Sequence, residues 1–205
     1  MSSKLHQLTM AYSQKEDRIL LRIGTQEQTE YRLWLTRRFV RSFWAPLIKV
    51  LSGSTQPAKT LQPKVKEAIM AMEHQESVKQ SDFTKKHSVK NKNITPTMNT
   101  NGNDLDSEKL RDSDDIDKKE PGESESPEDG AVLIIGARIR ALKNNLTGIN
   151  LKLANGSGIE FTLNKKLLHA LCHMMMKSCV KAGWKLDLSI GDSQVLVPKN
   201  ASQVH

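Results

Sequence analysis

The chain has 205 residues, and its 31 lysines and arginines against 23 aspartates and glutamates give a formal net charge of +8. Only 37% of the residues are hydrophobic, below the roughly 45–50% of a compact domain, so part of the chain is expected to stay unfolded. The sequence contains no apolar run long enough to span a membrane, and residues 1–18 lack the apolar core of a signal peptide. We therefore expect a cytoplasmic protein with reduced cysteines.

The N-terminal region predicts three strands followed by a helix. Residues 5–12, 18–23 and 31–35 alternate between apolar and polar side chains, which is the period of a half-buried strand. After Thr36, which suits an N-cap, the apolar residues follow one stripe of a helix. Residues 1–52 thus predict an antiparallel meander covered by one helix, with a kink or a new start at Pro46.

Residues 53–130 predict a linker. Pro63 and the helical spacing of Val65, Ile69 and Met72 indicate a helix over 64–79. Residues 82–130 have little to bury, and residues 91–130 carry twelve acidic against five basic side chains. Such a segment cannot offset its ordering entropy, so we expect a disordered acidic linker over about 82–130.

Residues 131–205 repeat the first pattern. Strands are predicted over 132–142, 149–153 and 159–163, and Asn164 is predicted to cap a helix that ends near Ala182. A fourth strand through Trp184, Leu186 and Leu188 and a short fifth over 195–197 complete this unit.

The two units align when Leu35 is placed on Leu163. Their third strands, helix stripes and N-cap positions then coincide, and the second strands coincide if the first turn is given two extra residues. We therefore predict an α+β fold of two duplicated β-meander-plus-helix units. They are expected to share one sheet or to pack as a pseudo-twofold pair, because neither unit buries much core alone.

No catalytic motif is present: the chain lacks a glycine-rich phosphate loop, a nucleophile elbow and an HExxH zinc motif. We expect a protein that is not an enzyme and uses no cofactor. One predicted helix carries soft-metal ligand types, namely His169, Cys172, His173, Met176 and Cys179. A helical wheel places the cysteines on the core stripe and His173 on the opposite face, which favours core cysteines with surface histidines over a metal site.

Basic side chains mark the outward positions of the predicted strands and the starts of both helices. The outward set is Arg18, Arg22, Arg32 and Trp34 in the first unit and Arg138, Arg140 and Lys152 in the second; the helix starts carry Arg37, Arg38, Lys165 and Lys166. Guanidinium groups beside an indole suit single-stranded DNA or RNA, and cations beside free backbone N–H groups suit phosphate. The alternative is that the charges solubilise the sheet. In that case Trp34 is buried by the other half or by a dimer partner, or Leu20 and Trp34 belong to a homo-oligomer or protein interface.

Two resemblances accompany this pattern. The stretch 31–41, Tyr-Arg-Leu-Trp-Leu-Thr-Arg-Arg-Phe-Val-Arg, resembles the start of a group of small uncharacterised bacterial proteins, which implies no activity. Strands followed by a helix, duplicated in one basic chain, are similar at fold level to the Pur-alpha and Whirly families of single-stranded nucleic-acid binders. Those families use four strands per unit where this sequence predicts three before each helix. The resemblance implies nucleic-acid binding on a sheet.

Overall fold

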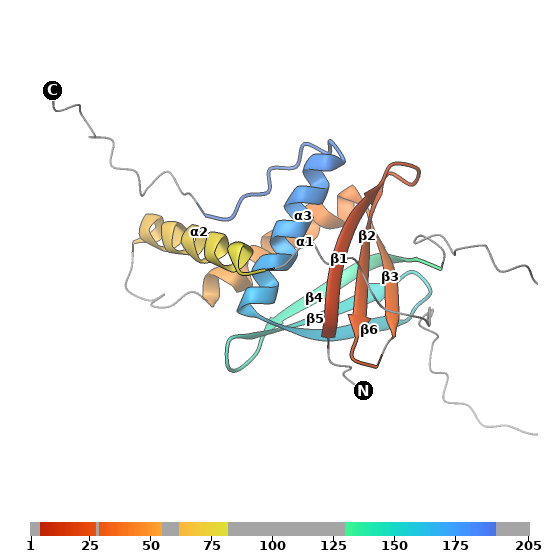
Figure 1. Ribbon diagram of the computed structural model, residues 1–205, viewed down its shortest axis with the longest axis horizontal. Helices are drawn as coiled ribbons and strands as arrows, with labels where there is room; N and C mark the ends of the chain where they lie inside the picture. The colour runs from red at the N-terminus through yellow and green to blue at the C-terminus, as the bar shows by residue number, and fades with distance from the viewer. Residues whose placement is uncertain (1–4, 28, 55–61, 82–129, 192–205) are drawn as a thin grey trace, which may run out of the picture.

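The computed structural model describes residues 5–27, 29–54, 62–81 and 130–191 (Figure 1). These residues form an α+β fold with one mixed six-stranded sheet and three helices. The strands lie in the sheet in chain order: β1 (Leu5–Ser13), β2 (Arg18–Thr25), β3 (Glu30–Leu35), β4 (Val132–Ala141), β5 (Leu146–Leu153) and β6 (Gly158–Asn164). The helices are α1 (Arg37–Gly53), α2 (Pro63–Lys79) and α3 (Lys165–Lys181). None of the three is long and apolar enough to cross a membrane.

Each half is an antiparallel meander that passes almost directly into a helix. The predicted N-caps are confirmed, because Phe39 N donates to Thr36 Oγ1 at 3.2 Å and Leu167 N donates to Asn164 Oδ1 at 2.9 Å. Of the kink or new start predicted at Pro46, the new start is wrong, since α1 is one helix from Arg37 to Gly53. Pro46 lies on the exposed side of α1, where water can satisfy the carbonyl that it leaves unpaired.

The two meanders share one sheet through a short parallel contact between β3 and β4. Leu33 pairs with Val132, and Trp34 pairs with Leu133. The helices then cross between the halves: α1 packs against β4 of the second meander, and α3 packs against β1 of the first. A single hydrophobic core includes both helices and the inner faces of both meanders, so the two halves fold around common residues.

The strand register relates β2 and β3 of the first half to β5 and β6 of the second by a spacing of 128 residues. The first strands, β1 and β4, differ from this spacing by one residue. Leu21 pairs with Leu33, and Ile149 pairs with Phe161; likewise Ile19 pairs with Leu35, and Thr147 pairs with Leu163. The sequence alignment allowed the first turn two extra residues, and this shift is therefore wrong. That alignment matched Ile19 with the apolar Ile149, whereas the residue that corresponds in register is the buried Thr147.

Helix α2 belongs to the folded body, where it packs against α3. Its buried residues are Ala68, Met70 and Ala71, whereas Val65 and Met72 are 40% and 56% exposed. The apolar stripe predicted for this helix is therefore not its packed face, which is formed by Ala68, Met70 and Ala71. The linker predicted over about 82–130 lies almost entirely outside the described residues, and the strand predicted over 195–197 lies wholly outside them.

The strand predicted after α3 does not form. Gly183 ends the helix with a φ of +64°, and Lys185 follows with a φ of +49°. Trp184 and Ile190 are buried in the core while the residues between them alternate in exposure. The alternation that predicted a strand thus comes from a segment that packs one side against the rest of the fold without pairing to the sheet.

Candidate functional site

The outer face of β2 and β3 is not an open basic surface. Leu20 and Trp34 are 4% and 6% exposed within this single chain. Arg22 and Arg32 lie opposite each other in the register, and Glu30 Oε1 accepts from Arg22 Nε at 2.6 Å and from Arg32 Nε at 3.1 Å. Glu30 itself is 4% exposed, so one buried carboxylate bridges both guanidinium groups. The expected exposed indole beside two available arginines is therefore absent from this face.

The cations expected at the helix starts have separate surroundings. Arg37 and Arg38 are exposed in the first turn of α1. Lys165 is committed to structural contacts, since its Nζ lies 2.6 Å from Glu73 Oε1 of α2 and 3.3 Å from the Ser54 carbonyl oxygen. Lys166 is exposed and lines a groove described below. The sequence treated these two basic pairs as equivalent, and the presence of α2 at only one of them makes them different.

Exposed cations also occur on the outer face of the second meander. Arg138, Arg140 and Lys152 alternate with the core residues of β4 and β5 and are all exposed. Arg140 pairs with Glu160 at 3.5 Å, and both side chains are 58% exposed, so the pair is solvated. In the first unit, Arg18 lies 3.6 Å from Glu16 at the β1–β2 turn. The structure thus divides the predicted basic residues among several places on the fold.

Helix α3 buries its two cysteines but does not leave both histidines at the surface. Cys172 and Cys179 are unpaired in the core, and burial raises the pKa of both thiols, that of Cys179 to about 11. His169 is fully buried, which corrects the expected surface position. Its Nδ1 lies 3.3 Å from His74 Nδ1 of α2. Among the described residues, no three histidine, cysteine or acidic side chains are placed to hold a metal ion.

The histidines at the α2–α3 contact are neutral at pH 7. Burial lowers the pKa of both His74 and His169 from 6.5 to about 4, and the neighbouring charges add to this effect: His173 lowers that of His74, and His74 lowers that of His169. His169 Nε2 is buried without a hydrogen-bond partner in the described structure. The contact between these helices therefore depends on uncharged imidazoles.

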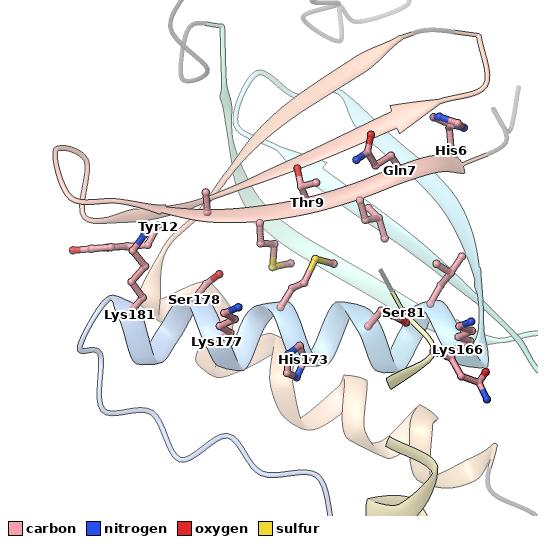
Figure 2. A pocket seen from close by; sticks show the side chains of 17 residues that line it. His6, Gln7, Thr9, Tyr12, Ser81, Lys166, His173, Lys177, Ser178 and Lys181 are labelled. Carbon is pink, nitrogen blue, oxygen red and sulfur yellow. The ribbon is translucent and has the colours of Figure 1, made fainter. Parts of the chain in front are cut away.

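A groove of about 840 Å³ lies between β1 and α3 (Figure 2). His6 and Lys166 lie toward one end, and Tyr12 and Lys181 lie at the other. Its apolar lining residues are Leu8, Met10, Ala11, Leu167, Ala170 and Met174. Three lysines, Lys166, Lys177 and Lys181, also line it, and its described lining contains no aspartate or glutamate. Gln80 and Ser81, which follow α2, form part of its border.

The sequence identified only Lys166 among these residues. The groove exists because α3 of one half lies along β1 of the other, and no spacing within either half reveals that contact. One signal was available: Lys166, Lys177 and Lys181 recur at intervals of eleven and four residues, which keeps them near one side of a helix.

Comparisons with models of protein families, with curated proteins and with solved structures found no match.

The Glu30 bridge predicts a large difference between two otherwise similar substitutions. Glu30→Gln removes the buried charge shared by Arg22 and Arg32, and should lower the free energy of unfolding by about 3 kcal/mol. Glu160→Gln removes the partner of exposed Arg140 and should change it by less than about 0.5 kcal/mol. Urea denaturation of both variants measures the difference, and equal small losses would contradict the structural role of Glu30.

The neutral histidines predict a loss of stability in acid. The unfolded chain binds protons at these sites below pH 6.5 but the folded chain only below about 4, so stability should fall as the pH drops from 6.5 toward 4. His169→Leu should reduce the loss between pH 7 and pH 5 by roughly 1–2 kcal/mol. The exposed His6→Leu control should keep the native loss. Urea denaturation at pH 7 and at pH 5 measures this loss of stability. If His169→Leu loses as much stability as the native protein, the prediction is wrong.

Proposed function

We propose that this chain is a non-enzymatic protein-interaction module that binds its partner in the groove between β1 and α3. The observation that carries the proposal is the composition of that groove, in which an aliphatic and thioether surface is bordered by lysines without carboxylates. Apolar side chains supply most of the affinity in such sites, and charges select the partner. Methionine side chains such as Met10 and Met174 adapt to different apolar partners.

A protein partner suits this groove better than a nucleic acid. Binding of single strands depends on aromatic faces on which bases stack. Tyr12 is the aromatic residue among the described lining, but its hydroxyl donates to Asp17 and its ring packs edge-on against Trp184. Trp34, the indole expected to stack, is buried elsewhere. The groove therefore offers apolar contact and cations without a stacking platform.

The proposal is tested by selecting peptides from a random phage-displayed library on the immobilised full-length protein. Met174→Trp should fill the groove and weaken the selected peptides at least tenfold in fluorescence anisotropy. Val180→Trp is the matched control, because Val180 lies on the same helix, is 82% exposed and does not line the groove; it should leave affinity within twofold. The proposal is wrong if no peptides are selected, or if Met174→Trp leaves the affinity of the selected peptides unchanged.

One observation favours a second candidate, the binding of single-stranded nucleic acid on the outer face of β4–β6. Arg138, Arg140 and Lys152 are exposed together there, and each can neutralise a phosphate. The fold-level similarity to Pur-alpha and Whirly proteins points to the same activity by analogy alone.

Anisotropy with labelled single-stranded DNA and RNA over a salt series tests this second candidate. Replacing Arg138 and Arg140 by alanine should weaken binding. The slope of the logarithm of the binding constant against the logarithm of the salt concentration should also become shallower, by the equivalent of about two phosphate contacts. The control replaces two exposed α1 cations, Arg41 and Lys49, by alanine, and should leave both quantities close to native. Absence of binding below about 10 μM at 50 mM salt would eliminate the candidate.

We further propose that the two halves arose by duplication and that the protein works in the cytoplasm. The spacing of 128 residues that relates the β2–β3 pair to the β5–β6 pair supports the first statement. The second is supported by Cys172 and Cys179, which are buried as free thiols.

A further inference from the structure

We infer that the groove between β1 and α3 takes a short extended peptide segment of a partner protein, with acidic residues toward both ends and aliphatic residues between them. The inference rests on the proposed function and adds the chemistry of the partner. It follows from where the lysines lie along the groove, from the apolar surface between them and from the size of the space.

The lysines that line the groove favour a partner with acidic groups near both ends of it. Lys166 lies in the first turn of α3, whereas Lys177 and Lys181 lie in its last two turns. At 1.5 Å per residue, Lys166 and Lys177 are about 16 Å apart along the helix. Lys177 and Lys181 are exposed, and no described aspartate or glutamate lines the groove to neutralise them. A partner carboxylate near each end would complete an ion pair that the described lining of the groove does not supply.

The apolar surface between these two ends favours aliphatic side chains on the partner. Leu167, Ala170 and Met174 follow one another at i, i+3 and i+7 on α3 and so form one stripe. Leu8 and Met10 face them from β1 and are only partly buried by the core. Burying this surface with leucine, valine or methionine side chains contributes roughly 25 cal/mol for each Å² removed from water.

The dimensions favour an extended segment over a helix. An extended chain covers about 16 Å with five residues, and the β1 stretch that lines the groove, from His6 to Tyr12, is of similar length. β1 is an edge strand of the sheet, so an extended segment can lie alongside it as a further strand, which a helix cannot do.

A lipid chain fits the lining less well than a peptide. Gln7 and Thr9 of β1 point away from α3 (Figure 2), but the ammonium groups of Lys166, Lys177 and Lys181 border the groove. An alkyl tail would remove water from these groups without offering hydrogen bonds in return, which costs free energy. A peptide backbone carries donors and acceptors at every residue and can replace that water.

The inference is tested on the peptides selected above with the full-length protein. They should be enriched in aspartate or glutamate flanking aliphatic residues. Replacing Lys177 and Lys181 together by glutamate should weaken them at least tenfold at 50 mM salt and less at 300 mM, because salt screens exposed ion pairs. The control, Lys49→Glu with Lys143→Glu, makes the same charge change at exposed sites outside the groove and should leave affinity within twofold.

The outcomes separate this inference from the proposed function. Selected peptides that are neutral or basic but still weakened by Met174→Trp would overturn the acidic partner and leave the groove as a binding site. Peptides indifferent to Met174→Trp would overturn both. Deletion of residues 91–129 that raises peptide affinity more than tenfold would assign the groove to this chain's own acidic segment. Peptide-induced dissociation of a dimer, seen by light scattering, would assign it to a second copy.

Discussion

The exchange of helices between the two halves is the constraint on which the rest of the structure depends. Each meander has an apolar inner face, and the helix that follows it in the chain reaches the other half: α1 packs against β4, and α3 packs against β1 as well as against β5 and β6 of its own half. Leu47 and Leu51 of α1 and Leu168 and Met175 of α3 are therefore fully buried in a core that neither half encloses alone. The sheet contact between β3 and β4 has only two residue pairs, so the helices make most of the contact between the halves.

This exchange also explains where the fold is open. At the β3–β4 contact the two meanders meet and the sheet is continuous, whereas β1 ends the sheet on one side and β6 ends it on the other. Helix α3 lies along β1, and the space that remains between them is the groove. Helix α2 then packs on α3 and brings Gln80 and Ser81 to the border of the groove. Helix α2 also contacts the start of α3 through Glu73 and Lys165, which makes the two helix starts unequal.

The sequence predicted the elements well because their signals are local. Strand alternation, the N-caps Thr36 and Asn164 and the C-terminal Gly183 each act within a few residues, and the structure has all three devices in place. The sequence failed where exposure depends on distant contacts. Trp34 and Leu20 occupy outward strand positions yet are buried, and His169 is buried because α2 covers it. Trp184 and Ile190 alternate with exposed residues but pack without pairing to a strand.

The same distinction applies to the candidate binding surfaces. The sequence could place Arg22 and Arg32 on one face, but it could not show that Glu30 lies buried between them. A charge that is already bridged by a buried carboxylate is costly to redirect toward a ligand, because the partner left behind would be an uncompensated buried ion. Lysines such as Lys177 and Lys181 carry no such penalty, since they are exposed on α3. The availability of a charge, rather than its count on a face, therefore favours the groove over the β2–β3 face as the place where this protein meets a partner.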